Sequence, residues 1–284
     1  MLILGKISRF SLFTLSVPYF IVRRAFFLSC LKRADLWVKS PFKYLFSPVK
    51  LPDGNLVFWS WEEDAFWLRD MIKEIYEDHA YEHFFGAEKG EVVIDVGANI
   101  GIFTLKSSKK VGEKGKVVAF EPKKRNYDLL SRNIRINKCQ NVLPLNIAVS
   151  DSNCNGTLYV KSVSLHNTLL EQTDFETDTI KTETVKVRKL SSVLKNLNIK
   201  HVDFLKIDAE GCELSVLKGL EEFLLRKQIK KISVAAYHSA KQLDIISEYL
   251  NKWGYFVLNL QSNGLAGFQR THVFAVSQQA HLSV

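Results

Sequence analysis

The chain has 284 residues, of which 46% are hydrophobic, so it can bury the core of one large domain with an attachment, or of two small domains, and disorder is excluded. Its formal net charge of +9 is concentrated at one end, because residues 1–50 hold nine basic residues and one acid, whereas the other 234 residues hold 30 basic and 29 acidic ones. This distribution argues against a catalytic domain built to contact nucleic-acid phosphates.

The four cysteines show neither C-x-x-C spacing nor a cluster with histidine, since they stand alone at positions 30, 139, 154 and 212. A disulfide framework and a zinc site are therefore not expected. Reduced thiols in a cytosolic compartment are the default for such a chain.

Residues 1–40 are both hydrophobic and basic. Their longest uncharged run covers residues 10–22, which is 13 residues, whereas a membrane-spanning helix needs about 20. Aromatic side chains mixed with Lys and Arg favour a segment lying in the interface of an anionic membrane. Packing on the domain or in a dimer is the alternative. An export or anchor signal is a third one, although Arg23 and Arg24 stand where a cleavage site should be.

Residues 41–90 are expected to form a hairpin and a helix that cover a ligand pocket. The Pro-Asp-Gly sequence at 52–54 predicts the turn of a hairpin, with residues 56–59 as its second strand. Residues 62–84 show the apolar periodicity of a helix. The candidate pocket aromatics, which could equally be core residues, are Trp61, Tyr76 and Tyr81.

Residues 92–101 predict a buried strand, a glycine turn and the start of a helix. Such a unit directs backbone N–H groups and a positive helix end at a ligand. Gly97 and Gly101 allow positive φ and close approach of a ligand, and Asn99 tolerates a left-handed backbone. The spacing Asp-x-Gly-x-x-x-Gly departs from the dinucleotide pattern, and Asp95 suits the cationic methionine end of S-adenosylmethionine better than a pyrophosphate.

The second strand supports a nucleoside ligand. Residues 116–120 are largely apolar and are followed by Glu121 and Pro122. Glu121 stands 24 residues after Gly97, near the interval of about 20 at which a doubly wound fold places its ribose-binding carboxylate. A solvated loop acid is the alternative for Glu121.

From residue 91 strands and helices alternate, which predicts a parallel sheet with right-handed crossovers. A Thr/Ser/Asn-rich insertion at residues 151–188 interrupts the alternation and is expected near the carboxyl ends of the strands. Two closing strands, 255–260 and 271–277, are appended to this sheet, as in class I methyltransferases. The expected strands are 91–96, 116–121, 142–147, 202–207 and 230–236, and the expected helices are 99–111, 124–138, 189–196, 212–227 and 239–253.

Residues 206–213, Lys-Ile-Asp-Ala-Glu-Gly-Cys-Glu, place three carboxylates at the end of a buried strand. Clustered carboxylates are costly unless they bind something, and ligands of open α/β sheets lie at that edge. Capping of the following helix is the alternative and could explain one or two of the three acids, but not why Lys206 and Asp208 flank a buried strand end.

Taken together, these motifs resemble the FkbM family of S-adenosylmethionine-dependent methyltransferases over about residues 65–260. The resemblance implies a class I, Rossmann-like, doubly wound α/β fold with a mostly parallel seven-stranded sheet and a terminal antiparallel hairpin, here as a domain at 91–280. Where many members carry Glu-x-His, this chain has Ala236-Tyr237-His238. The motifs are Asp-Val-Gly-Ala-Asn-x-Gly at 95–101, Phe-Glu-Pro at 120–122, Asn133 with Asn137, residues 148–151, the motif at 206–213, Leu217 with Gly219, and Gly254-Tyr255.

These observations yield a set of expected site residues. We expect His238 to act as general base because of its pKa, with Asp208 beside it, although a structural His238 is the alternative. Lys206, Glu210 and Glu213 are candidates for contacting substrate or a divalent metal ion, and the metal is not favoured. The expected cofactor residues are Asp95, Gly97, Ala98, Asn99 and Gly101 for the methionine end, Glu121 and Pro122 for the ribose, and Asn146, Ile147 and Ala148 for the adenine.

The expected activity is O-methylation of a hydroxyl on a sugar, glycan or lipid-linked metabolite. Methyl-ester formation on a sugar acid and a non-catalytic binding module are the alternatives. The charge of residues 1–40 predicts a cytoplasmic enzyme docked on a membrane surface and acting without nucleic acid.

Overall fold

The computed structural model describes residues 48–60, 68–160, 181–239, 241–263 and 269–277. The chain divides into two compact units, residues 1–47 and 48–284, and all described residues belong to the second. The predictions for residues 1–40 and for Trp61 lie outside the described residues. Among the described residues, no helix combines the length and the apolar character needed to cross a bilayer.

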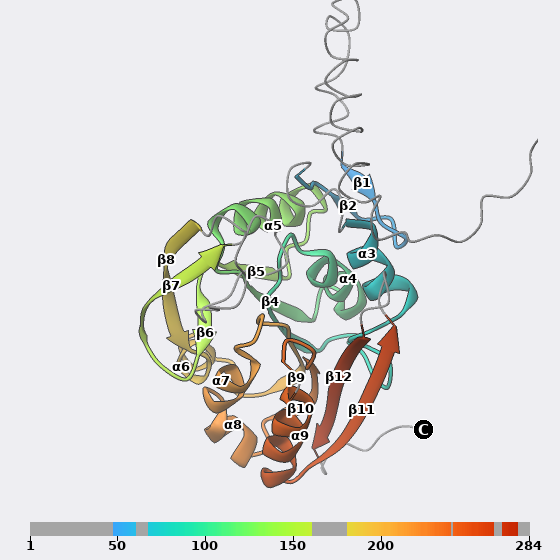
Figure 1. Cartoon of the computed structure of the whole chain (residues 1–284). Coiled ribbons are helices and arrows are strands. Elements are labelled where there is room, and N and C mark those ends of the chain that lie inside the picture. Colours follow the sequence, from blue (N-terminus) through green and yellow to red (C-terminus); the bar gives the residue numbers. More distant parts are fainter. Residues whose placement is uncertain (1–47, 61–67, 161–180, 240, 264–268, 278–284) are drawn as a thin grey trace, which may run out of the picture. The chain divides into compact units, whose positions relative to one another are not determined.

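A seven-stranded sheet forms the centre of the second unit, in the order β11-β12-β10-β9-β3-β4-β5 (Figure 1). Strand β12 runs antiparallel to both neighbours, and the other pairs are parallel. The predicted parallel sheet with a terminal antiparallel hairpin is therefore confirmed. The strands are β3 (Val92–Val96), β4 (Lys116–Phe120), β5 (Val142–Leu145), β9 (Val202–Ile207), β10 (Ile229–Ala235), β11 (Tyr255–Asn263) and β12 (Gln269–Ser277).

Helices cover both faces of this sheet because its central strands are apolar on both sides. Val93, Val117 and Phe204 pack on the face covered by α3 (Leu68–Ile72), the π-helix η1 (Lys73–Glu77) and α4 (Ile102–Val111), and α5 (Lys124–Ile136) packs on Ala119. Ile94, Val118 and Leu205 pack on the other face against α6 (Leu190–Asn196), α7 (Glu213–Lys218), α8 (Glu221–Leu225) and α9 (Gln242–Lys252).

The insertion contributes to a second, three-stranded sheet with its own apolar cluster. Strand β8 (Lys181–Lys189) lies between β6 (Ala148–Ser150), to which it is parallel, and β7 (Cys154–Val160), to which it is antiparallel. The backbone N–H of Lys124 donates to Glu183 Oε2 at 3.4 Å. Because Lys124 begins the helix that follows β4, this contact puts β8 near the carboxyl ends of the central strands, as the sequence predicts.

The predicted N-terminal hairpin is present as two short strands, β1 (Val49–Lys50) and β2 (Leu56–Val57). Asn133 of α5 and Asn137, which follows α5 directly, hold it against the domain by bonding to backbone groups as a neighbouring strand would. Asn137 accepts from the N–H of Leu56 at 2.7 Å and donates to its carbonyl at 2.6 Å, and Asn133 makes the same pair of bonds with Phe58. Asn133 and Asn137 therefore have a structural role.

The helix predicted over residues 62–84 is shorter in the structure. Among the described residues of this range, helix covers only 68–77, and its second half is π-helical. The helix ends because Asp78 bonds back to the carbonyl of Lys73 and the next residue, His79, has a φ of 49°. The apolar periodicity of the sequence does not predict this left-handed backbone at His79, so it does not predict where the helix ends.

The helix predicted over residues 212–227 is divided into α7 and α8 at Gly219 and Leu220. A Cβ at Gly219 would collide with the carbonyl oxygen of Ser150 in β6, so only glycine fits at this break between the two helices. The predictions for helix starts at 99 and 239 are also too early, since α4 begins at Ile102 and α9 at Gln242.

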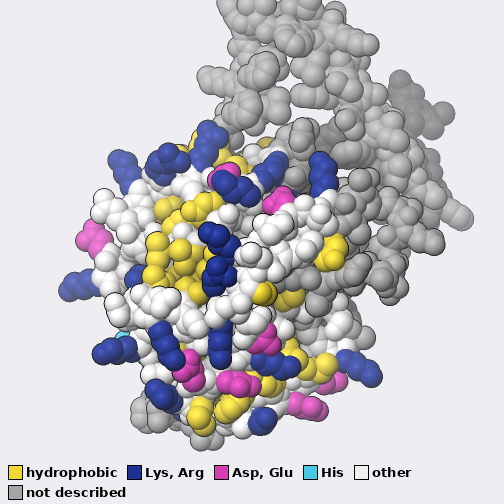
Figure 2. Space-filling model, turned by 90° about the vertical axis from the view of Figure 1, so that its left-hand side faces the viewer, with side chains coloured by type: hydrophobic (Ala, Val, Ile, Leu, Met, Phe, Trp, Pro, Cys, Tyr) yellow, Lys and Arg dark blue, Asp and Glu magenta, His cyan; other side chains and the backbone are white. Residues whose placement is uncertain are grey.

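On the face of the molecule that Figure 2 shows, Lys and Arg side chains are more frequent than Asp and Glu side chains, and they border a hydrophobic area.

Candidate active site

The glycine turn after β3 adopts the predicted left-handed backbone, with φ of 73° at Gly97, 51° at Asn99 and 96° at Gly101. A Cβ at Gly97 would collide with the carbonyl oxygen of Asp208, and one at Gly101 would lie 2.6 Å from Leu130 Cδ1. The two glycines therefore permit close packing of protein segments. The expectation that the two glycines also allow close approach of a ligand stays a prediction.

Asp95 and Lys206 form a buried ion pair. They are directly opposite each other on β3 and β9, with Asp95 Oδ1 3.1 Å from Lys206 Nζ, and their side chains are 0% and 4% exposed. The ammonium also donates to the carbonyls of Val96 at 3.1 Å and Gly97 at 2.8 Å, while Thr104 donates to Asp95 Oδ2 at 2.5 Å.

An ammonium has three donors, and three oxygen atoms surround that of Lys206. Burial lowers the pKa of Lys206, but the charges of Asp95 and Asp208 outweigh burial and raise it, so the group is a cation. Lys206 is therefore committed to holding β9 against the glycine turn. These contacts favour a structural role over the predicted contact of Lys206 with substrate or metal, which stays a prediction.

Glu121 follows β4 directly and reaches across to the glycine turn. Its Oε2 accepts the backbone N–H of Asn99 at 2.8 Å, and its Oε1 accepts that of Lys123 at 3.0 Å. Burial raises the pKa of Glu121 to about 7, because these two donors offset only part of the lost hydration. Each carboxylate oxygen accepts one of these N–H groups and keeps a further lone pair, which suits it to accept a hydroxyl.

The residues expected around the adenine follow β5 directly. The side-chain amide of Asn146 donates to the carbonyls of Glu121 and Pro122, both at 2.9 Å, and thereby fixes the segment relative to the end of β4. Ile147 is half-buried and Ala148 is buried at the start of β6. The structure brings Pro122, Ile147 and Ala148 to the same edge of the sheet as Glu121.

The acidic motif forms a tight loop between β9 and α7. Glu210 and Gly211 both have positive φ, 51° and 98°, which is uncommon for a glutamate. Glu213 is fully buried and closes the loop, since its Oε1 accepts the N–H groups of Ala209 at 2.8 Å and Gly211 at 3.1 Å. Glu213 therefore ties this loop together, whereas α7 has no side-chain cap at its N-terminus.

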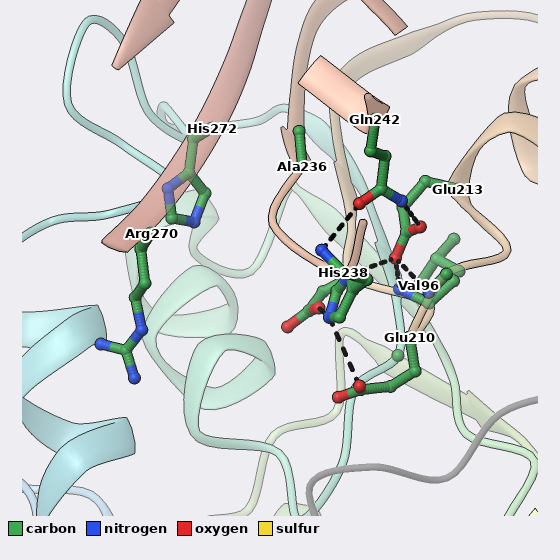
Figure 3. Close-up of polar contacts among 12 residues, drawn as sticks. Val96, Glu210, Glu213, Ala236, His238, Gln242, Arg270 and His272 are labelled. Carbon is green, nitrogen blue, oxygen red and sulfur yellow. Dashed lines mark hydrogen bonds and ion pairs between the residues drawn. The ribbon is translucent and has the colours of Figure 1, made fainter. Parts of the chain in front are cut away.

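His238 follows β10 and lies among the carboxylates of this loop (Figure 3). Its Nδ1 is 3.1 Å from Glu213 Oε1, and its Nε2 is 3.3 Å from Glu210 Oε2 and 3.7 Å from Asp208 Oδ1. Gln242, at the start of α9, accepts the backbone N–H of His238 at 2.8 Å and donates to Glu213 Oε2. The ring is thus held on both sides.

The charges around His238 decide its protonation. Burial lowers its pKa, but hydrogen bonds and charge from Glu210 and Glu213 raise it to about 11. At neutral pH the ring is therefore an imidazolium, which has no lone pair to accept a proton. A general base must be unprotonated at the working pH, so this arrangement favours the structural alternative for His238, and the base role stays a prediction.

Asp208 is the third carboxylate beside this histidine, and its Oδ1 is farther from the ring than the nearest oxygens of Glu213 and Glu210. Burial raises its pKa, but the charges of Lys206 and His238 and a hydrogen bond from Tyr81 lower it below the ordinary value. The Tyr81 hydroxyl donates to Oδ2 at 2.7 Å, and within the described residues Oδ1 is buried without a hydrogen-bond partner. Burial raises the pKa of Glu210 to about 7, so Glu210 is the group here that titrates near neutral pH.

A metal ion at this loop would compete with existing hydrogen bonds. Ligand atoms of Asp208, Glu213 and His238 lie within 4.8 Å of one another, close enough to share a cation. Glu213, however, already accepts two backbone N–H groups and the amide of Gln242. The donor set therefore fits the proton of His238 better than a divalent ion.

The sequence analysis missed Gln242, Glu74, Arg270 and His272, which lie near this site. Gln242 stands four residues after His238, and its signal would have been an amide facing back from the first turn of the next helix. Glu74 and Arg270 are 196 residues apart in the sequence, so only the fold brings them together. Tyr81, named as a candidate pocket aromatic, does contact Asp208.

Comparison with known proteins matches this architecture to one family. The family model described as the methyltransferase FkbM domain matches residues 95–257, more than half of the chain. Methyltransferase sdnD of Sordaria araneosa is 32% identical over 181 residues, which cover 54% of this chain and 68% of the relative. Hexuronic acid methyltransferase AglP of Haloferax volcanii is 28% identical over 156 residues, which cover 55% of this chain and 57% of the relative.

One solved structure shares the fold. The methyltransferase FkbM from Methylobacillus flagellatus KT superposes with a TM-score of 0.52 at 17% identity, covering 74% of this chain and 53% of that one. The chain thus spans about half to two thirds of the length of these proteins.

Proposed function

The chain belongs to the FkbM family of methyltransferases, and on that premise we propose that it methylates a hydroxyl of a sugar, glycan or lipid-linked metabolite. Its methyl donor is S-adenosylmethionine, as the family and fold imply. The observation that carries the proposal is the ionised Asp208, whose buried Oδ1 accepts no hydrogen bond in the described part of the chain and has only the ion-pair contact with His238 at 3.7 Å. Asp208 lies at the same sheet edge as the glycine turn and Glu121.

The residues at this edge fit the cofactor. Glu121 keeps lone pairs for the two ribose hydroxyls, and Asn99 Oδ1 is buried with no hydrogen-bond partner among the described residues. We assign the backbone of residues 97–101 to the methionine end and residues 146–148 to the adenine. When bound, S-adenosylmethionine supplies a methyl group attached to a positively charged sulfur, and the sulfur keeps the electron pair of the carbon–sulfur bond that breaks.

Asp208 takes the proton in this proposal. Its Oδ1 accepts a hydrogen bond from the acceptor hydroxyl and so orients the oxygen for an in-line displacement, where most of the catalysis comes from positioning. As the oxygen gains the methyl carbon it becomes positively charged and strongly acidic. A carboxylate with a lowered pKa is basic enough to accept that proton. Tyr81 holds the other oxygen of Asp208, and the His238 imidazolium keeps Asp208 ionised.

Methyl-ester formation is the second candidate. AglP, whose name describes a hexuronic acid methyltransferase, is 28% identical to this chain. A carboxylate acceptor needs no base, so Asp208→Asn would reduce its methylation little. With a hydroxyl acceptor the same substitution should lower kcat about 100-fold or more, in the range of general-base effects.

Calorimetry with S-adenosylhomocysteine tests the cofactor assignment. We expect the wild type and Asp208→Asn to bind with similar affinity, and Glu121→Ala to bind about tenfold or more weakly through the lost ribose bonds. A folded wild type that ignores S-adenosylhomocysteine, or prefers NAD, would refute the assignment. Binding without turnover on any acceptor would instead favour the non-catalytic module.

We further propose that the enzyme works at a membrane surface through residues 1–40. The support is the charge distribution, with a net +8 in residues 1–50 against +1 in the remainder. Each basic residue near an anionic leaflet contributes about 1 kcal/mol. A form beginning at Lys39 should lose co-sedimentation with vesicles containing anionic lipid, and salt should weaken binding of the full chain. Equal partitioning of the two forms would contradict this proposal.

A further inference from the structure

A second buried polar cluster lies between the first helical segment and β12. Arg270 Nη2 is 2.8 Å from Asp70 Oδ2 and 3.5 Å from Glu74 Oε2, and Glu74 Oε1 is 4.0 Å from His272 Nε2. All four side chains are at most 15% exposed. We call Asp70, Glu74, Arg270 and His272 the β12 cluster, and Figure 3 shows its two members on β12 beside the site of His238.

Two tyrosines connect the β12 cluster to the proposed catalytic carboxylate. The ring of Tyr81 packs edge-on against His272, with 5.1 Å between ring centroids, while its hydroxyl bonds to Asp208. The ring of Tyr237 lies 4.5 Å from that of His238 and 5.6 Å from that of His272. The cluster is therefore continuous with the place where the acceptor must react.

Several polar atoms of this continuous group have no hydrogen-bond partner among the described residues. They are Asp70 Oδ1, Glu74 Oε1, Asp208 Oδ1 and both ring nitrogens of His272, which is 0% exposed. Leaving a buried polar group unbonded costs about 1–3 kcal/mol. Such a group of atoms is arranged for a ligand that supplies several hydrogen bonds.

The kinds of unbonded atom define that ligand. Burial raises the pKa of Glu74 to about 7, so its carboxyl group accepts when ionised and also donates when protonated. Burial lowers the pKa of His272 to about 4, so its neutral ring offers one donor and one acceptor. Hydroxyl groups both donate and accept, and thus match both side chains. A ligand carboxylate only accepts, and the one guanidinium of the cluster already pairs with Asp70 and Glu74.

The β12 cluster lies outside the segment that defines the family. The family model matches residues 95–257. Asp70 and Glu74 lie before this range, and Arg270 and His272 lie after it. Segments beyond a shared catalytic core are where recognition of different acceptors can be built on one chemistry.

We propose that the β12 cluster is the acceptor-recognition surface, and that it selects an uncharged, polyhydroxylated ring over a carboxylate-bearing one. The inference rests on the proposed function and specifies its substrate class. It assigns specificity to Glu74 and His272, and it favours hydroxyl methylation over methyl-ester formation.

Ligand-observed NMR titration of the S-adenosylhomocysteine-saturated protein tests the proposal with two probes, methyl α-D-glucopyranoside and its uronate, methyl α-D-glucopyranosiduronate. We expect the neutral glycoside to bind about tenfold more tightly than the uronate, measured as the ratio of the two dissociation constants. Glu74→Gln should reduce this ratio by removing negative charge, and His272→Phe should weaken the neutral glycoside while keeping the ring contact with Tyr81.

Glu91→Gln is the matched control. It alters a comparably buried ion pair, Glu91 with Lys231 at 2.8 Å, at the opposite end of the strands, and should leave the ratio unchanged. Retained S-adenosylhomocysteine binding together with equal affinity for both probes, no binding of either, or a ratio insensitive to Glu74→Gln overturns this inference alone. Loss of S-adenosylhomocysteine binding by the folded wild type removes the proposed function and this inference with it.

Discussion

Replacement of Lys206 by methionine separates a structural role of this lysine from a role in binding substrate or metal. The substitution keeps an unbranched side chain of similar length but leaves Asp95, which is 0% exposed, without its ion-pair partner. Breaking a buried pair in this way costs about 3–5 kcal/mol. Since whole domains have about 5–15 kcal/mol of stability, the loss should be large in urea unfolding.

Lys195→Met is the matched control, because Lys195 forms an ion pair with Glu222 at 2.5 Å in which the side chains are 58% and 33% exposed. Such surface pairs contribute about 0–1 kcal/mol. Adding Asp95→Asn to Lys206→Met should restore part of the stability by removing the unpaired charge. A Lys206→Met variant as stable as the control, with lost turnover, would show that Lys206 serves the substrate and would refute the structural reading.

Three further predictions follow from the site. Gly97→Ala should abolish S-adenosylhomocysteine binding and destabilise the fold by more than the left-handed strain of about 1–2 kcal/mol, whereas Gly112→Ala, with φ of 66° and open space around its Cβ, should cost that strain alone. Between about pH 6 and pH 9 the free energy of unfolding should fall more for the wild type than for His238→Gln. The reason is that the pKa of His238 is raised from 6.5 to about 11 in the folded protein, so its stabilising effect is complete below pH 6.5 and is lost as the pH rises. Parallel curves of unfolding free energy against pH would contradict the assignment. Turnover should persist in excess EDTA, and loss that added Mg²⁺ or Ca²⁺ restores would contradict a metal-free reaction.

The alternation of strands and helices was predictable because each central strand is an apolar run bounded by glycine or charge. The left-handed backbone at Gly97, Asn99 and Gly101 also followed from residue type alone. Where helices end was less predictable, since the division at Gly219 depends on the approach of Ser150 from a distant strand.

The ion pairs and protonation states of the site could be inferred only from the folded structure. Asp95 and Lys206 pair because β3 and β9 are neighbours in register, although 110 residues separate them. The ordinary pKa of histidine suggested a base at His238, but the carboxylates of Glu210 and Glu213 reverse that expectation. A sequence motif identifies which residues gather at a strand end, and their contacts determine which of them is charged.

Transfer of labelled methyl from S-adenosylmethionine into fractionated cell extract tests the central claim most directly. The full-length wild type and Asp208→Asn are compared, with the extract separated into lipid, glycan and RNA fractions. We predict label in the glycan or lipid fraction with the wild type, and about 100-fold less with Asp208→Asn, in line with loss of a general base. Label in RNA, or equal labelling by a folded Asp208→Asn that binds S-adenosylhomocysteine normally, would contradict the account.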